Sequence, residues 1–203
     1  ALAKQSLRAQ ALNPTAVRIL GYVADARGQK DKARELILLS EKMSRREFGA
    51  QLWLIEDAAA RNDVKTALKH YDIALRATSE SPVILFPTLN DAMALSDVRD
   101  GFVPYVRQWP AWMTSYIGQA IEGVANPADV ADVLIRGGKM PVDASTRFIP
   151  PALLAKLASK GQYRTFRQYY ATLPGAKAAA LTTVSMNADS VNLRYPVAGW
   201  QLT

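Results

Sequence analysis

The sequence repeats itself at a spacing of 34 residues, and this repeat limits the possible folds more than any other feature. Shifting the chain by this amount aligns residues 14–44 with residues 48–78, and small residues fall on small residues. Two helices approach closely only where the side chains between them are small, and a Gly or Asn between them can adopt a left-handed turn. The repeat therefore predicts stacked helical hairpins. The aligned pairs include Leu20 with Leu54, Ala24 with Ala58, Gly28 with Asn62, Ala33 with Ala67, and Ser40 with Ala74.

These positions resemble the tetratricopeptide repeat family over residues 1–82. The matching residues are Leu20-Gly21 in the first helix, Gly28 in the turn, Ala33 at the start of the second helix, and Pro82 after the second copy. The resemblance implies an all-α fold, a right-handed α-α superhelix of helical hairpins. The chain departs from the family where Val17 and Gln51 replace the first-helix Trp and Ile55 replaces its Gly.

Three regions are expected along the 203 residues, which suffice for a sizeable core. Residues 1–110 are predicted to be tetratricopeptide-like repeats, residues 111–175 degenerate helical hairpins, and residues 176–203 a short extended or β segment. This last segment alternates Thr, Val, Tyr and Trp from Leu181 onward, which suits strands. It is either a tail lying on the last hairpin or the start of a truncated β domain. The chain reads as a piece of a longer protein or a processed product.

Capping residues and apolar spacing predict the helix boundaries. Asn13-Pro14 and Asn126-Pro127 are expected to start helices, and Ser44 with Glu47 has the spacing of a capping box. The predicted helices are 2–12, 15–27, 30–43, 45–60, 63–77, 83–95, 97–108, 111–124, 127–136, 150–160 and 162–173. No apolar run is long enough to cross a membrane.

Residues that support catalysis are scarce. The chain has no Cys and a single His, His70, so thiolate sites and multi-His metal sites are excluded. The carboxylate pairs Asp97/Asp100 and Asp129/Asp132 are assigned to first helical turns, where acids offset the helix dipole. The sequence thus predicts a protein that is not an enzyme and needs no cofactor or metal.

Stacked hairpins create a concave surface, and the resemblance places its partner contacts on the first helix of each hairpin. The predicted function is a non-catalytic scaffold that binds a protein or peptide in this groove. Trp53 has two interpretations, an exposed contact or a residue that fills the seam between hairpins. The candidate partner-binding residues are Arg18, Tyr22, Asp25, Trp53, Glu56 and Asn90.

The charge distribution supports an alternative. The chain carries a formal net charge of +7, and residues 136–177 alone hold eight basic residues against Asp143. This region is either a solvated face or a module that binds an anionic polymer, such as an acidic polysaccharide, in a bacterial envelope or periplasm. Nucleic acid is disfavoured because no groove-reading motif is present. The candidate anion-binding residues are Lys156, Lys160, Arg164 and Arg167, and Tyr163, Phe166 and Tyr170 are predicted to be core.

Overall fold

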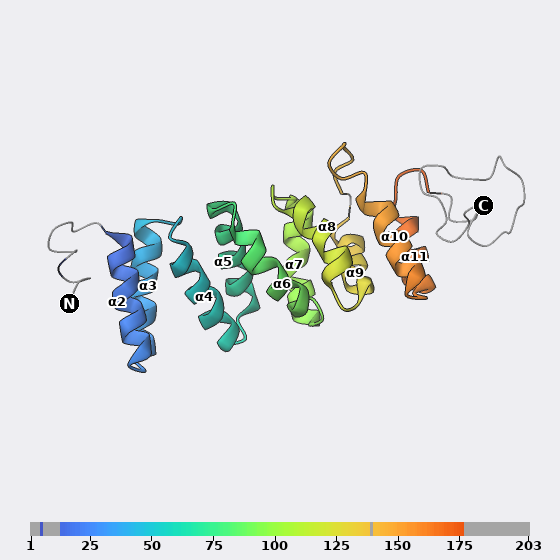
Figure 1. Cartoon of the computed structure of the whole chain (residues 1–203). Coiled ribbons are helices and arrows are strands. Elements are labelled where there is room, and N and C mark those ends of the chain that lie inside the picture. Colours follow the sequence, from blue (N-terminus) through green and yellow to red (C-terminus); the bar gives the residue numbers. More distant parts are fainter. Residues whose placement is uncertain (1–4, 6–12, 139, 177–203) are drawn as a thin grey trace, which may run out of the picture. The chain divides into compact units, whose positions relative to one another are not determined.

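The computed structural model describes residue 5, residues 13–138 and residues 140–176, and these residues form helices without any β-strand (Figure 1). The predicted helices from residue 15 to residue 173 are all present, with ends shifted by up to three residues. The segment 2–12, apart from the helical residue Gln5, and the predicted extended segment from residue 177 onward lie outside the described residues. The helices are α2 (Pro14–Ala26), α3 (Lys30–Met43), α4 (Phe48–Ala60), α5 (Val64–Ala77), α6 (Ser81–Ala92), α7 (Ser96–Gln108), α8 (Met113–Gly123), α9 (Pro127–Gly137), α10 (Ile149–Ser159) and α11 (Tyr163–Ala171). None of these helices is long and apolar enough to span a bilayer.

The chain divides into two compact units, Ala1–Leu85 and Phe86–Thr203, which we call unit 1 and unit 2. The division falls within α6, close to residue 82, where the resemblance to the tetratricopeptide repeat ends. The boundary at residue 110 stays a prediction. The 34-residue repeat thus lies within unit 1.

Unit 1 contains two antiparallel hairpins, in which α2 packs on α3 and α4 packs on α5 (Figure 1). The side chain of Ala33 is 0% exposed and that of Ala67 is 9% exposed, so both predicted contact points are buried. Gly21 lies opposite Ile37, and a Cβ added to it would come within 2.7 Å of the Ile37 side chain. Small residues therefore permit the close approach, as the repeat predicts.

Both hairpins of unit 1 turn in the same way. Gly28 has φ +75° and Asn62 has φ +55°, so the predicted left-handed turns are confirmed. The following residue donates a backbone hydrogen bond to the last turn of the helix, from Asp63 to the carbonyl of Ala58 in the second hairpin (2.9 Å). Gly161, with φ +68°, forms the same turn between α10 and α11. The turn therefore recurs in unit 2, where the sequence repeat is not recognisable.

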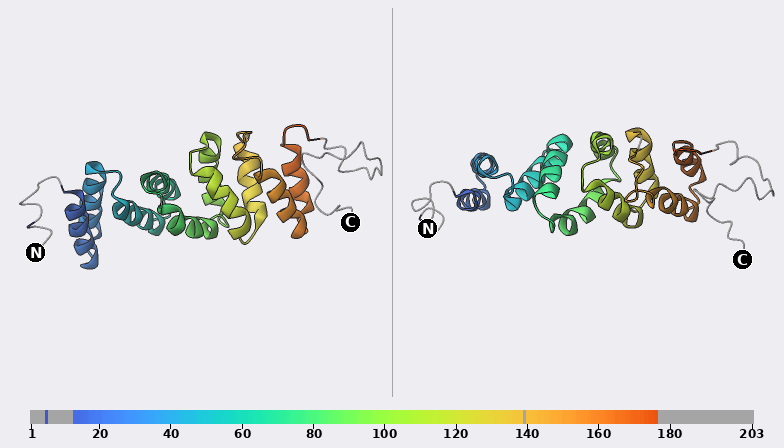
Figure 2. Two further views of the ribbon diagram at one scale, coloured as in Figure 1. Left: turned by 45° about the horizontal axis from the view of Figure 1, so that its top comes forward. Right: turned by 90° about the horizontal axis from the view of Figure 1, so that it is seen from above.

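Unit 2 is built by contacts between both sequential and alternate helices: α8 packs on α9 and α10 on α11. In this unit α7 packs on α9 and α9 on α11, while α8 packs on α10 (Figure 2). Tyr116 of α8 is fully buried, with its ring centroid 5.2 Å from that of Phe86 in α6 and 5.3 Å from that of Phe102 in α7. Aromatic packing thus connects the first three helices of the unit.

Helix capping follows the prediction at two of three positions. Asn13 and Asn126 accept backbone hydrogen bonds at the starts of α2 and α9. The predicted capping box is wrong, because α3 ends at Ser44 and α4 begins only after Glu47. The Glu47 side chain instead accepts hydrogen bonds from Thr15 and Arg18 of α2. Its role is to join the α3–α4 connection to the first helix.

Candidate partner-binding surfaces

Trp53 lies in the seam between the two hairpins of unit 1. It is 7% exposed and belongs to a buried cluster with Ala24, Ala33, Ile37, Ala50 and Leu54. Its indole N–H donates to a carboxylate oxygen of Asp25 in α2 at 3.1 Å. The exposed position expected for Trp53 is therefore wrong, and the interpretation as a seam residue is confirmed. The large ring buries more surface by packing between hairpins than it would at the edge of an open groove.

Arg18 and Tyr22 lie together on the half-buried side of α2. The Arg18 guanidinium is 5.1 Å from the centre of the Tyr22 ring, and its Nε donates to Glu47 at 2.6 Å. The Tyr22 hydroxyl donates to the carbonyl of Gly49 at 2.6 Å. Gly49 must be small here, because a Cβ would come within 2.8 Å of the Tyr22 oxygen. The structure thus holds both side chains in fixed positions while leaving them partly accessible.

The other predicted contacts have different surroundings. Asp25 is half-buried and binds Lys30 at 2.6 Å, and the hydrogen bonds from Lys30 and Trp53 lower the pKa of its carboxyl. Glu56 is exposed on α4. Asn90, in unit 2, is 5% exposed and donates its amide N–H to Gln119 of α8 at 3.3 Å. Its expected exposure is wrong, because its side chain lies against α8, where a Cβ added to Gly123 would meet the Asn90 amide nitrogen.

Sequence reasoning missed the charged contact between the hairpins of unit 1. The Arg34 guanidinium of α3 donates to both oxygens of Asp57 in α4, at 2.8 and 2.9 Å. Arg61 binds the same carboxylate at 3.1 Å, and the Asp57 side chain is only 8% exposed. The hydrogen bond from Arg34 is the largest cause that lowers the pKa of Asp57. The carboxylate therefore joins α3 to α4 and is not free to act as an acid or base.

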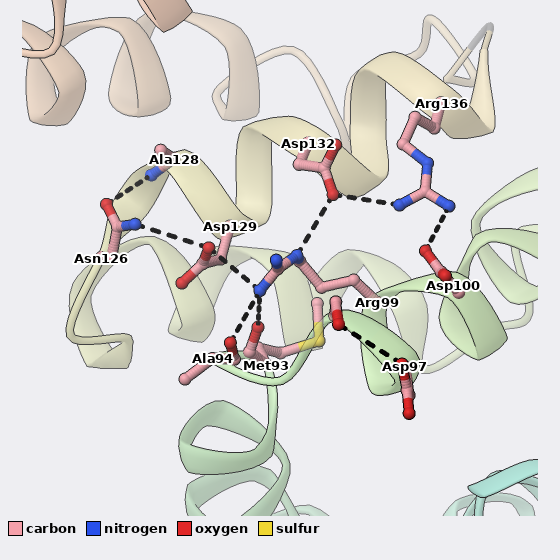
Figure 3. Close-up of polar contacts among 11 residues, drawn as sticks. Met93, Ala94, Asp97, Arg99, Asp100, Asn126, Ala128, Asp129, Asp132 and Arg136 are labelled. Atoms are coloured by element: carbon pink, nitrogen blue, oxygen red, sulfur yellow. Dashed lines mark hydrogen bonds and ion pairs between the residues drawn. The ribbon is translucent and has the colours of Figure 1, made fainter.

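A second charged network joins α7 to α9 in unit 2 (Figure 3). Arg99 binds Asp129 and Asp132, both at 3.2 Å, and donates to the carbonyl of Met93 at the end of α6 (2.8 Å). Arg136 binds Asp132 at 3.1 Å and Asp100 at 2.6 Å. Asp97 and Asp129 lie in first helical turns, as predicted, but the same prediction is wrong for Asp100 and Asp132, which lie beyond the first turns of α7 and α9.

Ion pairs with arginine, more than interactions with the helix dipole, account for the acidic residues of the second network. Burial raises the pKa of Asp129 even beside Arg99, so the ion pair forms where solvation of the carboxylate is poor. Figure 3 shows the Arg99 guanidinium between the two acids of α9 and the carbonyls at the end of α6. A single arginine therefore connects three helices of unit 2.

His70 has the structural role favoured by its isolation in the sequence. It is 3% exposed, and its Nδ1 lies 2.7 Å from the side-chain oxygen of Gln51 in α4. Burial lowers the pKa of the imidazole. The described residues contain no group of three or more His, Asp or Glu side chains placed to hold a metal ion.

The predicted anion-binding residues fall into two groups. Lys156 binds Glu122 of α8 at 2.5 Å, so its charge is already paired. Lys160, Arg164 and Arg167 are exposed, and no ion pair connects them to another described residue. Tyr163 is 64% exposed, so its prediction as core is wrong, whereas Phe166 and Tyr170 are buried and stacked. The outer face of α11 therefore combines free cations with one exposed aromatic ring.

A cavity of about 690 Å³ is lined by residues of α9, of the connection between α9 and α10, and of the end of α11 and the residues that follow it. Its walls are mainly apolar, and they include Met140, Leu173 and Pro174. Arg147 supplies a positive charge at the wall. Such a cavity suits an apolar group with a neighbouring negative charge, and its described lining residues include no pair of groups arranged for acid–base chemistry.

The interpretations above rest on the sequence and the structure of the chain, because the comparisons with known proteins found no match. No family model matches the chain, and no curated protein matches its sequence.

Proposed function

We propose that the chain is a non-catalytic scaffold that binds a protein or peptide across the first helices of its hairpins. The observation that carries this proposal is the ordered pair Arg18 and Tyr22, which is fixed by Glu47 and Gly49 yet partly accessible. Tyr and Arg side chains are enriched among residues that dominate binding energy. Holding them rigid before binding reduces the conformational entropy lost when a partner docks.

Glu56 extends this surface by one repeat, because it stands 34 residues after Tyr22. It is exposed on α4, so it can contact a partner without disturbing the seam that contains Trp53. The proposed surface therefore consists of Arg18, Tyr22 and Glu56. The buried Trp53 and its hydrogen-bond partner Asp25 hold together the hairpins that carry it. Its partner is expected to present an aromatic or aliphatic side chain with a basic group nearby.

The scaffold is tested by affinity capture with the intact chain and three variants. Glu56→Arg and Tyr22→Ala should each lose a bound protein that the unchanged chain retains. Glu35→Arg, which reverses an exposed acid on α3, is the matched control and should retain it. A partner retained equally by all variants would contradict the proposed surface.

The alternative function is binding of an acidic polymer by Lys160, Arg164 and Arg167. It is supported by the absence of acidic residues from positions 144–188 of the sequence and by the exposure of these three cations. Polygalacturonate is a suitable probe, and its affinity should fall steeply as salt rises if the three cations bind it. Changing Lys160, Arg164 and Arg167 to Gln should abolish this binding. Affinity that is indifferent to salt and to these substitutions would exclude the alternative.

A further inference from the structure

The cavity of unit 2 has apolar walls made of both buried and exposed residues. Leu134 of α9 and Leu173, which follows α11, are buried and line it. Val142, in the connection between α9 and α10, also lines it and is 60% exposed. Its volume of about 690 Å³ falls within the range of about 300–1,000 Å³ that small-molecule sites span. The cavity is therefore large enough for an apolar ligand and has the walls to bind one.

Hydrogen bonds within the connection between α9 and α10 fix one wall of the cavity. The Asp143 carboxylate accepts from the backbone N–H groups of Ser145 at 2.7 Å and Thr146 at 3.2 Å. The hydroxyl of the buried Thr146 donates to the carbonyl of Pro141 at 2.7 Å. Because these bonds order the wall in the free chain, little conformational entropy is lost when a ligand binds.

Arg147 is the one charged side chain among the described residues that line the cavity. It is exposed, and no ion pair connects it to another described residue. The nearby acid Asp143 is already bound by Ser145 and Thr146. A guanidinium can donate two parallel hydrogen bonds to a carboxylate, so Arg147 is suited to a ligand with one such group.

We propose that this cavity binds a fatty acid, with its hydrocarbon chain against Leu134, Leu173 and Val142 and its carboxylate on Arg147. A single cation beside apolar walls matches a ligand with one negative charge and a long apolar part. An acidic polysaccharide does not fit this description, because it has many charges and no hydrocarbon chain. The site uses no residue of the proposed partner surface, so it adds a small-molecule ligand to the scaffold.

Equilibrium dialysis of the full chain against radiolabelled dodecanoate, kept below the concentration at which it aggregates, tests the proposal. We expect saturable binding of one dodecanoate per chain. Each methylene removed from water strengthens binding about fourfold, so octanoate should bind at least about tenfold more weakly. The absence of saturable binding, or equal affinities for the two acids, would overturn the proposal.

Two pairs of variants locate the ligand. Arg147→Gln should weaken dodecanoate binding about fivefold and change the affinity for the uncharged dodecan-1-ol by less than about twofold. Arg164→Gln removes an exposed arginine that does not line the cavity and is the matched control. Val142→Ser should weaken binding of both ligands about threefold, whereas Val83→Ser, at an exposed valine of α6, should not.

Equal effects of the two arginine variants, or of the two valine variants, would overturn the proposal, because the ligand would then not lie in this cavity. All four positions are exposed, so these variants are expected to fold. None of these outcomes depends on Arg18, Tyr22 or Glu56, and the fatty-acid site and the scaffold therefore fail separately.

Discussion

The two units use opposite charge arrangements for the same purpose. In unit 1 a single acid, Asp57, lies between two arginines, Arg34 and Arg61. In unit 2 a single arginine, Arg99, lies between two acids, Asp129 and Asp132. Asp57 joins α3 to α4, and Arg99 joins α7 to α9. At each of these helix contacts a buried or half-buried carboxylate is paired with arginine, but the shared residue is an acid in unit 1 and an arginine in unit 2.

The core of unit 1 provides the largest expected effect on stability. Trp53→Ala should lower the free energy of unfolding by about 3 kcal/mol, because it removes a buried ring from the seam between hairpins. Calorimetry of the intact chain measures this effect. Glu56→Ala, on the exposed side of the same helix, is the control and should change it by less than about 0.5 kcal/mol. Equal effects would mean that Trp53 does not fill the seam.

The stability contributed by each charged network should depend to a different degree on its arginine. Arg99→Ala should lower the free energy of unfolding by about 2 kcal/mol, because Asp129 would remain half-buried without a cation. Arg34→Ala should cost about 1 kcal/mol, because Arg61 still binds Asp57. Urea unfolding measures both changes. A larger loss for Arg34→Ala would reverse the comparison between the units.

Much of the fold could be predicted from the sequence because its signals are local. Asn-Pro pairs at positions 13–14 and 126–127 mark helix starts, and the Gly28 and Asn62 turns follow from backbone sterics. The small residues of unit 1 repeat at the same spacing as its hairpins. Unit 2 contains the same left-handed turn at Gly161, but its core combines aliphatic side chains with an aromatic group around Tyr116, and the sequence repeat is not recognisable there.

The candidate site was less predictable, because its contacts join residues far apart in the sequence. Arg34 and Asp57 are 23 positions apart, and Arg99 and Asp132 are 33 positions apart. Nothing in the local sequence distinguishes these charges from solvated ones. For the same reason Tyr163, which is predicted to be core, is exposed, and the two interpretations of Trp53 could be separated only by the structure, in which it is buried. Their environment depends on which helix packs beside them.

The turns allow a finer comparison. Gly28→Ala should cost about 1 kcal/mol, because a left-handed backbone strains a residue with a Cβ. Gly28→Asn should cost less, because Asn62 occupies the equivalent position in the next hairpin with φ +55°. Thermal unfolding distinguishes the two variants. If Ala and Asn are tolerated equally at position 28, backbone conformation does not determine the residue at this turn.

The pH dependence of stability should differ between the units. The folded state holds the pKa of His70 below its ordinary value of 6.5, so the unfolded chain binds the proton more readily. The stabilising contribution is complete above pH 6.5 and is lost as the pH falls through the folded pKa. His70→Gln should remove this dependence of the free energy of unfolding on pH from unit 1. Unit 2 has no histidine, and the protection factors of the amides in α7–α9, which are corrected for the intrinsic pH dependence of exchange, should not change over the same pH range. If the free energy of unfolding of His70→Gln depends on pH as it does in the unchanged chain, other titrating groups cause the dependence.

The central claim is that paired charges hold successive hairpins together, and a double-mutant cycle on Arg34 and Asp57 tests it most directly. The cycle uses Arg34→Ala, Asp57→Ala and the double variant, with unfolding free energies measured in urea. Pairing between hairpins predicts a coupling of about 1 kcal/mol. The matched cycle on Lys32 and Glu35, an exposed pair within α3, should give less than about 0.5 kcal/mol. Equal coupling in the two cycles would contradict the claim.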